Sequence, residues 1–354
     1  MMLEIDGSQG EGGGQVLRTS LSLSALTGRP FHLTNIRDNR SKPGLRPQHV
    51  TAVRAVAAIC DAEVTGDELD SSTLTFAPQL KPKGGDYTFD VTDASPGRSA
   101  GAVTLILQAV LWPLLFADKP SQLILRGGTF VPFSPPYHYM AEVARPAFAR
   151  LGATFTTKLN AWGWNPSGGG EIEVAIDPID SLEAIEEWAV KLDDWRIVNG
   201  VAAVTNLRAH IPQRMAKRAE KLLRQDGLTP QITQVRERGR GPGTGLCLWI
   251  TQAGFAGLGK KRVPAQRVAE TAVSDLLAFM ENGADVDMHL ADQLLLPMAL
   301  ANGESEFATD QLTSHTITCA ELLRQWLDVD IKIDGKQNEP ATIQIQGTSF
   351  SRAI

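Results

Sequence analysis

The fold of this chain is decided by a pattern that begins with GQVLRTSLSLSALTG (14–28). This stretch reads as a helix that stops at Gly28, because glycine tolerates the left-handed backbone found at helix ends. It is followed by a strand-like segment, RPFHLTNIR (29–37), and by PQHVTAVRAVAAICDAEV (47–64). The last segment reads as a second helix entering a strand, since its apolar residues recur at helical spacing and predict one buried face.

The same order of helix, strand, helix and strand occurs twice more. The second occurrence comprises SAGAVTLILQAVLWPLLFAD (99–118), SQLILRGG (121–128) and PPYHYMAEVARPAFARLGATFTT (135–157). The third comprises HLADQLLLPMALANG (289–303), SEFAT (305–309) and SHTITCAELLRQWLDVDIKID (314–334). A histidine stands at the start of each second helix: His49, His138 and His315. Although α/β sequences are loosely self-similar, this recurrence favours a true repeat that packs helix pairs on one face of a sheet.

Residues 181–283 break the pattern. They contain helical segments at 212–227 and 263–280 and a strand-like segment, GLCLWITQ (245–252). We therefore predict two domains, one made of residues 1–180 and 284–354 and a smaller inserted one made of residues 181–283. The insert is rich in basic residues, which most often form a solvated face. RNA contact there is the less favoured alternative for Arg208, Arg214, Lys217, Arg218, Lys221, Arg224, Arg236, Arg238 and Arg240.

The composition is that of a soluble globular protein. Hydrophobic residues are 43% and charged residues 21% of the 354 residues, which excludes a disordered or fibrous chain. The net charge of −6 excludes nucleic-acid binding driven by overall charge. Three distant cysteines argue against a disulfide framework and for a reducing compartment. The polar start of the chain and the short apolar run 103–117 predict no secretory signal and no membrane span, so we expect a cytoplasmic location.

A glycine-rich loop, DGSQGEGGGQVLR (6–18), opens the first helix. Glycines let backbone N–H groups approach an anion, and a helix N-terminus favours negative charge. Glu11 would repel a bare phosphate unless it held a metal ion, so Mg²⁺ bound between carboxylate and phosphate resolves the conflict. The alternative is a tight turn with an acid facing solvent.

A basic loop lies between the first strand and the second helix. Arg37, Arg40, Lys42 and Arg46 place four cations within ten residues, just before Gln48 and His49. Such a loop at a helix N-terminus suits phosphate recognition. An exposed basic loop without a ligand is an equally good interpretation of this segment alone.

Two polar segments of the third repeat can carry chemistry. Asp292 and Gln293 begin a helix and can hydrogen-bond a nucleobase, ribose or metal. His315 follows Ser314, which we expect to cap the next helix, and the positive helix end would keep its imidazole neutral. A neutral imidazole is a nucleophile toward phosphorus. The simpler interpretation of this segment alone is a histidine that only caps a helix. Gln108 lies in an apolar helix and needs partners, either structural or in a ligand.

Together these segments resemble the RNA 3′-terminal phosphate cyclase family. The resemblance includes residues 6–18 and 36–53, Gly127 to Pro136, GWNPSGGG (163–170), 289–301 and His315. It implies an α/β fold in two α+β layers, with three repeated units of a four-stranded sheet and two helices, plus a smaller inserted α/β domain. It also implies ATP-dependent conversion of an RNA 3′-phosphate into a 2′,3′-cyclic phosphate through a covalent histidine–AMP intermediate, with release of AMP and pyrophosphate.

The resemblance assigns roles by position. It makes His315, not His289, the nucleophile, and Glu11 the carboxylate that reaches a metal, Mg²⁺ or Mn²⁺. It places ATP against Gln108 and the segment His289, Leu290, Ala291, Asp292 and Gln293. It places the phosphates and the RNA end against Arg18, Arg37, Arg40, Gln48 and His49. The chain departs from the family pattern at Trp162, where Arg or His is usual, and at Cys319, which stands in place of an Asn.

Two other classes of protein compete with this interpretation. One is a non-catalytic RNA-binding protein of ribosome assembly with the same fold, which would lack the nucleophile. The other is an enolpyruvyl transferase, which has similar repeats and needs no adenylylated histidine. The presence of His315 and Glu11 favours the enzyme, whose partners are then ATP and an RNA 3′-phosphate end, with no membrane. The oligomeric state, monomer or homodimer, stays open.

Overall fold

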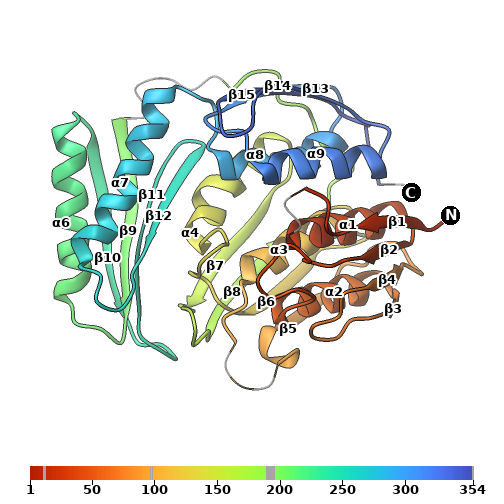
Figure 1. Ribbon diagram of the computed structural model, residues 1–354, viewed down its shortest axis with the longest axis horizontal. Coiled ribbons are helices and arrows are strands. Elements are labelled where there is room, and N and C mark those ends of the chain that lie inside the picture. The colour runs from red at the N-terminus through yellow and green to blue at the C-terminus, as the bar shows by residue number, and fades with distance from the viewer. Residues whose placement is uncertain (11–12, 96, 98, 189–195, 353–354) are drawn as a thin grey trace.

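The structure is a computed structural model that describes residues 1–10, 13–95, 97, 99–188 and 196–352. Two units of one topology form its first half (Figure 1). The first contains β1 (Leu3–Asp6), α1 (Gly14–Thr27), β2 (Phe31–Thr34), α2 (Pro47–Cys60), β3 (Glu63–Thr65) and β4 (Leu74–Ala77). The second contains β5 (Asp86–Asp90), a 3-10 turn η1 (Val91–Asp93), α3 (Val103–Leu115), β6 (Ser121–Gly127), α4 (Tyr137–Tyr139), η2 (Met140–Ala144), α5 (Arg145–Arg150), β7 (Phe155–Ala161) and β8 (Gly170–Ile176).

The predicted order of helix, strand, helix and strand is confirmed, with one more strand at each end of the unit. The sheets have the orders β1-β2-β4-β3 and β5-β6-β8-β7, in which the first pair is parallel and the others are antiparallel. Alternate residues of β6 are buried, from Ser121 and Leu123 to Gly127, because successive strand side chains point to opposite faces. One face of each sheet therefore packs on the helices.

The second helix of the second unit is not continuous, although residues 135–157 predict one unbroken helix followed by a strand. It begins as α4, widens into the π-helical turn η2, and returns to α-helix in α5. Pro146 explains the widening, because it has no amide hydrogen to donate to the carbonyl four residues earlier. The N–H of Arg145 instead donates to the carbonyl of Met140.

The third unit contains α8 (Met288–Leu300), β13 (Glu304–Thr309), α9 (Ser314–Trp326), β14 (Asp330–Gly335) and β15 (Ala341–Gln346). Within the described residues its sheet has three regular strands, β13-β15-β14, where four were expected. The place held by β1 and β5 is taken by residues 182–185. Glu183 forms a parallel bridge with Asn302, and the N–H of Ile185 donates to the Ser305 hydroxyl at 3.0 Å. A bond to a side chain interrupts the ladder, so this edge is irregular.

The segment between these two parts has a sheet of its own. It contains β9 (Ile197–Thr205), α6 (His210–Gln225), β10 (Thr229–Glu237), β11 (Gly243–Ile250), β12 (Ala253–Leu258) and α7 (Ala265–Asn282), with strand order β10-β9-β11-β12. Helices α6 and α7 cover one face of this sheet and share a separate hydrophobic core with it. We call it the insert. The domain boundaries at residues 181 and 283 stay a prediction, since residues 182–185 lie against β13.

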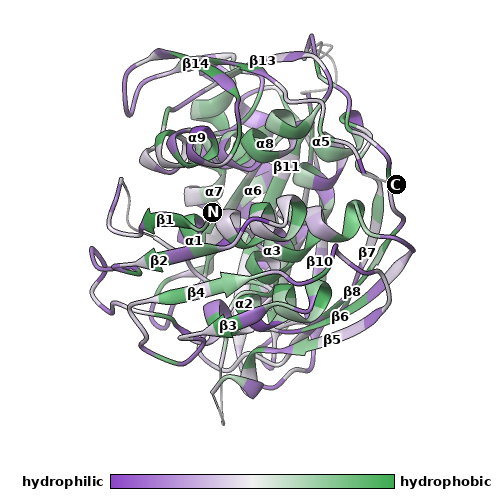
Figure 2. Cartoon of the chain, turned by 90° about the vertical axis from the view of Figure 1, so that its right-hand side faces the viewer, coloured by the Kyte–Doolittle hydropathy of each residue, from purple (hydrophilic) through white to green (hydrophobic). Residues whose placement is uncertain are grey.

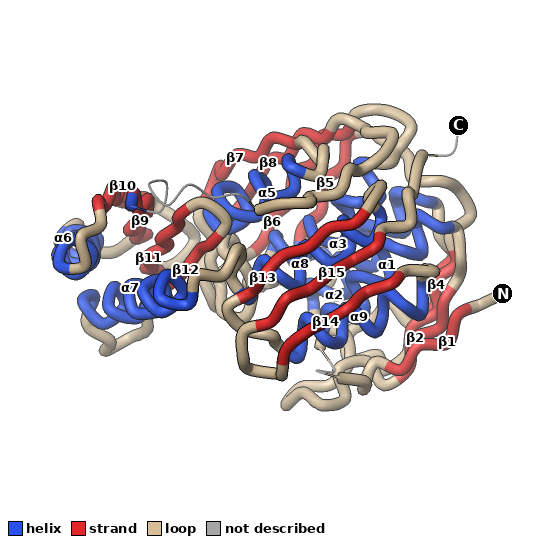
Figure 3. The backbone as a smooth tube through the Cα atoms, turned by 90° about the horizontal axis from the view of Figure 1, so that it is seen from above, coloured by secondary structure: helices blue, strands red, loops and turns tan. Residues whose placement is uncertain are grey.

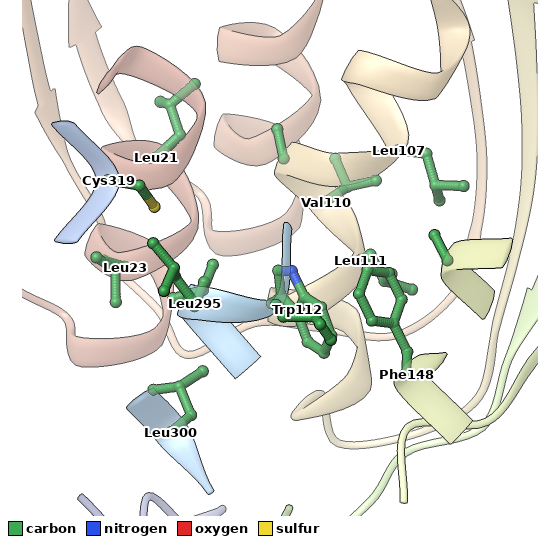
Figure 4. Close-up of a cluster of buried hydrophobic side chains, with 14 of the residues drawn as sticks. Leu21, Leu23, Leu107, Val110, Leu111, Trp112, Phe148, Leu295, Leu300 and Cys319 are labelled. Carbon is green, nitrogen blue, oxygen red and sulfur yellow. The ribbon is translucent and has the colours of Figure 1, made fainter. Parts of the chain in front are cut away.

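The helices of the three units form the interior, and their sheets lie outside. Figure 3 shows β13, β15 and β14 above α8 and α9, and apolar residues concentrate in the inner elements (Figure 2). One hydrophobic core spans all three units. Figure 4 shows its centre, to which α1 contributes Leu21 and Leu23, α3 contributes Leu111 and Trp112, and α8 contributes Leu295. Within the described residues, no helix has the length and apolar character needed to cross a membrane.

An aromatic cluster joins the second unit to the insert. We use this name for Phe130, His138, Trp162, Trp164 and Trp249. The rings of Trp162 and Trp164 stack with centroids 5.4 Å apart, and His138 stacks on Trp162 at 5.1 Å. Val201, Ala203 and Cys247, on the second face of the insert sheet, pack against the cluster. The central strands β9 and β11 of the insert sheet are therefore buried on both faces, whereas β10 at its edge is largely exposed.

Candidate active site

A cavity of about 50 Å³ lies where helices of the three units meet. Its polar wall combines Gln15 and Arg18 of α1, Gln108 of α3, and Asp292 and Gln293 of α8. Its apolar wall includes Leu111, Trp112, Phe148 and Cys319 (Figure 4). The fold thus brings Arg18, Gln108, Asp292 and Gln293, which were predicted to share a site, to one cavity. Gln15 was not predicted, although its place after three glycines was a usable signal.

His315 lies next to this cavity at the start of α9. Its Nδ1 is 2.7 Å from the side-chain oxygen of Gln15. The Gln15 side chain also hydrogen-bonds the carboxylate of Asp292. Because a carboxylate accepts and an amide oxygen accepts, the Gln15 NH₂ group faces Asp292 and its oxygen faces His315. Nδ1 of His315 therefore carries the ring proton, and Nε2 carries the lone pair.

The imidazole of His315 stays neutral over a wide pH range. Burial lowers its pKa to about 4, and the positive charges of Arg18, Arg40 and His289 add to the shift. The main cause is therefore burial rather than the helix end that the sequence suggested. The helix cap also differs, because Thr313, not Ser314, accepts the hydrogen bond from the N–H of Thr316, at 3.1 Å.

Arg18 and Asp292 place opposite charges on the cavity wall. Burial lowers the pKa of Arg18 to about 10, although the charge of Asp292 opposes this. Burial raises the pKa of Asp292 to about 6, against the attraction of His289 and Arg18. At neutral pH both groups are ionised. The cation of Arg18 is thus held at a poorly solvated position, where it attracts an anion more strongly than a surface arginine does.

His49 is held in the opposite tautomer to His315. Its Nδ1 accepts the backbone N–H of Arg46 at 3.0 Å, so Nε2 carries the proton. Burial holds its pKa well below the usual range, and Arg37, Arg18 and Arg46 lower it further. A side chain added at Gly14 would lie 2.5 Å from Nε2 of His49. Because Gly14 has no side chain, the N–H groups at the start of α1 and the Nε2–H of His49 face the same space.

The basic loop between β2 and α2 is shaped by one of its own arginines. Nη1 of Arg37 donates to the carbonyls of Lys42 and Gly44, at 2.8 and 2.9 Å. Arg40 is exposed and is one of the charges that lower the pKa of His315. The loop therefore faces the histidine. The side-chain oxygen of Gln48 accepts the N–H of Ala102, at 3.0 Å, just before α3, so its side-chain NH₂ group is the part that it can offer to a phosphate.

The amide groups of α3 and α8 satisfy each other. Nε2 of Gln108 donates to Oε1 of Gln293 at 2.9 Å, and Nε2 of Gln293 donates to the carbonyl of His289 at 2.6 Å. This is the partner that Gln108 required. In the same segment His289 is exposed, whereas the side chains of Leu290 and Ala291 are buried in the core. Those two residues can offer a ligand only their backbone.

Asp287 is a positioning residue that the sequence analysis missed. It caps α8, and its Oδ1 accepts the N–H groups of His289 and Leu290 at 2.8 and 3.0 Å. It also accepts the Tyr139 hydroxyl at 2.8 Å and, through Oδ2, the N–H of Gly254 at 2.9 Å. It thus joins α8, the second unit and the insert. An Asp directly before a helix of this kind is a capping signal, but its distant partners are invisible in the sequence.

The chain matches the family model of RNA 3′-terminal phosphate cyclase over residues 9–333. It belongs to this family. A protein named RNA 3′-terminal phosphate cyclase from Gloeothece citriformis is 47% identical over 344 residues, 95% of this chain and 97% of its own. Proteins of the same name from Nostoc punctiforme and Methanopyrus kandleri are 48% and 39% identical, over 94% and 98% of this chain and 96% and 99% of their own.

The resemblance read from the sequence is thereby confirmed, and with it membership of an enzyme family. A solved structure of the enolpyruvyl transferase NikO from Streptomyces tendae aligns over 97% of this chain and 48% of its own. Its TM-score is 0.33 at 12% identity, a similarity too low to support any argument.

The two departures from the pattern of the cyclase family are both buried. Trp162 is part of the aromatic cluster and is 8% exposed. Cys319 lines the cavity, and burial raises the pKa of its thiol to about 12, so it stays protonated. Neither residue brings a charge to the site.

A metal site cannot be assembled from the described residues alone. Among them, no group of three or more His, Cys, Asp and Glu side chains is placed to hold an ion. Glu11, the predicted carboxylate, lies outside the described residues. Mg²⁺ usually takes one or two carboxylates plus substrate phosphates, so a site completed by a nucleotide fits this arrangement. Gly10, the neighbour of Glu11, lies against Thr318 of α9.

Proposed function

We propose that this protein is an ATP-dependent RNA 3′-terminal phosphate cyclase that acts through a covalent AMP adduct on His315. The observation that carries the proposal is the hydrogen bond from Nδ1 of His315 to Gln15, which leaves the lone pair on Nε2 of a neutral ring. Family membership supports the substrates, ATP and an RNA 3′-phosphate end. Histidine is a known covalent nucleophile, and the cations around it suit phosphate chemistry.

In the first step, Nε2 of His315 attacks the α-phosphorus of ATP. A P–N bond forms and the bond to pyrophosphate breaks. The ring becomes positively charged. This charge strengthens the hydrogen bond that Nδ1–H of His315 donates to the side-chain oxygen of Gln15. Asp292 holds Gln15 in the accepting orientation through its own hydrogen bond. The two hydrogen bonds, from His315 to Gln15 and from Gln15 to Asp292, therefore stabilise the positively charged adduct, and the proton stays on Nδ1 of His315.

In the second step, an oxygen of the RNA 3′-phosphate attacks the AMP phosphorus and the P–N bond breaks, which returns His315 to its neutral form. In the third step, the adjacent 2′-oxygen attacks the 3′-phosphorus, loses its proton and expels AMP. Both steps gather negative charge that must be held in place. Arg18, Arg40 and the Nε2–H of His49 are the donors that we assign to this task.

The cavity must widen to accept a nucleotide. Its volume of about 50 Å³ is far below the roughly 300 Å³ or more of common ligand sites. Gln108 and Gln293, which hydrogen-bond each other, both line it, and a nucleoside would replace that hydrogen bond on each amide. A divalent ion, Mg²⁺ or Mn²⁺, would neutralise part of the triphosphate charge, held by phosphate oxygens and Glu11.

The direct test uses ATP labelled at the α-phosphate, a divalent metal and no RNA. We expect acid-labile label on the protein, which then moves to RNA when a 3′-phosphorylated oligoribonucleotide is added and leaves as AMP. Label absent from correctly folded wild-type protein would sink the mechanism. A non-catalytic RNA-binding role would then be the better interpretation.

The low pKa of His315 predicts an unusual pH profile for the adduct-forming step. Since the ring is neutral above about pH 4, the rate should not fall at the pKa of a free histidine, about 6.5. In Arg40→Ala, the loss of a nearby positive charge should move the acidic midpoint to higher pH. Measuring label incorporation against pH tests both points. A wild-type midpoint at or above 6.5, or a midpoint that Arg40→Ala lowers, would contradict the assignment.

A further inference from the structure

A loop of the insert reaches the second unit close to the phosphate-binding residues. We call residues 236–241, the end of β10 and most of the turn that leads to β11, the arginine loop; they include Arg236, Arg238 and Arg240. Nη2 of Arg240 donates to the carbonyl of Gly97 at 3.2 Å. A side chain added at Gly241 would lie 2.2 Å from the Ser167 hydroxyl, and one at Gly169 would touch Arg240. The loop thus packs directly on GWNPSGGG (163–170).

The backbone of the arginine loop is fixed by the insert. The Thr205 hydroxyl donates to the carbonyl of Gly241 at 2.7 Å. The Asn206 side chain donates to the carbonyl of Gly239 at 2.6 Å and accepts its N–H at 3.2 Å. Arg236 is also engaged, because its Nε donates to the carbonyl of Leu207 at 3.0 Å. The positions of Arg238 and Arg240 are therefore set by the fold, while both side chains are exposed.

One chain segment separates this loop from the site. Residues 99–102 contact GWNPSGGG on one side, since a side chain at Gly168 would lie 1.9 Å from the carbonyl oxygen of Ser99. On the other side, Ala102 is hydrogen-bonded to Gln48, the neighbour of His49. Residues 99–102 thus connect the arginine loop to the start of α2, which directly follows the basic loop of Arg37 and Arg40.

We propose that Arg238 and Arg240 bind the phosphodiester backbone of the substrate RNA on the 5′ side of its reactive end. This rests on the proposed function, which puts the terminal phosphate at Arg18 and His49. Guanidinium groups match phosphate oxygens in geometry and charge, and backbone contacts position RNA without reading its sequence. Because the protein as a whole carries a net charge of −6, RNA must be guided by such a local basic surface.

Helix α6 is the alternative surface, and the structure favours the loop. α6 lies at the outer edge of the insert (Figure 1). Two of its arginines are paired there, Arg218 with Glu270 at 2.7 Å and Arg224 with Glu220 at 3.3 Å. Lys217 and Lys221 of α6 line an open groove of about 650 Å³ together with Glu220. They have the same charge as the proposed residues but lie on the outer helix of the insert (Figure 1), and so provide a matched control.

The test compares Arg238→Ala/Arg240→Ala with Lys217→Ala/Lys221→Ala. Binding is measured by fluorescence anisotropy with a 3′-phosphorylated oligoribonucleotide and with a dinucleotide that carries the same 3′-phosphate. We expect the arginine variant to weaken oligonucleotide binding about tenfold and to lower the slope of log K against log salt by about 1.4, as two lost phosphate contacts require. Dinucleotide binding should change little, and the lysine variant should match wild type.

Equal losses on both RNAs, no loss on the longer RNA, or a larger loss in the lysine variant would each overturn this proposal. Adduct formation with ATP alone, measured on the same samples, separates the two hypotheses. If wild type forms no adduct, the proposed function fails, while the binding comparison still decides whether the arginine loop holds RNA. If the adduct forms and the arginine variant binds the longer RNA normally, only the loop assignment fails.

Discussion

His315→Ala is expected to abolish formation of the protein–AMP adduct and, with it, cyclisation of RNA 3′-phosphates. Loss of a covalent nucleophile commonly costs several orders of magnitude in rate, and we expect roughly 10⁴-fold or more. No described side chain offers a second nucleophile in the same position, since the exposed His289 lies on a different helix, α8. Transfer of label from α-labelled ATP to the protein measures the effect directly.

Two controls make this result specific. His289→Ala should still form the adduct, although it can bind ATP more weakly, because His289 is exposed and is assigned to ATP binding and not to nucleophilic attack. His315→Ala supplied with an RNA already carrying AMP on its 3′-phosphate should still form the cyclic end, because the third step does not use the nucleophile. An adduct that persists in His315→Ala and disappears in His289→Ala would show that the wrong histidine has been assigned.

Asp287→Ala is expected to lower the free energy of unfolding by about 4 kcal/mol. Loss of the helix cap accounts for about 1 kcal/mol. The Tyr139 hydroxyl and the Gly254 N–H lose a buried acceptor, at about 1–3 kcal/mol each. Burial raises the pKa of Asp287, which shows that burying its carboxylate is unfavourable. Removing the carboxylate removes this cost and offsets a part of the sum. Denaturation by urea, followed by circular dichroism, measures the change.

Asp287→Asn is the matched variant. Asn has the same shape, caps helices equally well, and keeps one oxygen for the N–H groups of His289 and Leu290. We expect it to lose less than half as much stability as Asp287→Ala. A loss below about 1 kcal/mol in Asp287→Ala would show that water replaces the carboxylate and that the three parts of the fold do not depend on it.

The sequence predicted those parts of the molecule that rest on local pattern. The helices α1, α3, α8 and α9 could be read because apolar side chains recur at helical spacing over three or more turns. The short edge strands β1 and β5 could not, since only one of the four residues of β1 and none of the five of β5 is fully buried, which leaves no clear alternation. The π-helical turn before Pro146 also escaped, although the missing proline donor was visible.

In the candidate site, too, some residues could be predicted from the sequence and others could not. The family resemblance assigned Gln108, Asp292 and Gln293 to ATP and Arg18 to phosphates, and all four line one cavity, while their roles stay predictions. The roles of Gln15 and Asp287 could not be read, because each depends on partners from other units: His315 for Gln15, and Tyr139 and Gly254 for Asp287. Hydrogen bonds between distant helices leave no periodic signal in one sequence.

The way the insert is attached has a mechanical consequence. The carbonyl of Ile185, before the insert, accepts the N–H of Glu306 at 3.4 Å, and the N–H of Val286, after it, donates to the carbonyl of Ala308 at 3.1 Å. Both attachments therefore lie on β13, about 7 Å apart. Two pivots this close define one axis, about which the insert would turn if the covalent chain alone held it. The aromatic cluster, Asp287 and the arginine loop each oppose that rotation, so the orientation of the insert depends on side-chain packing and not on its two chain connections.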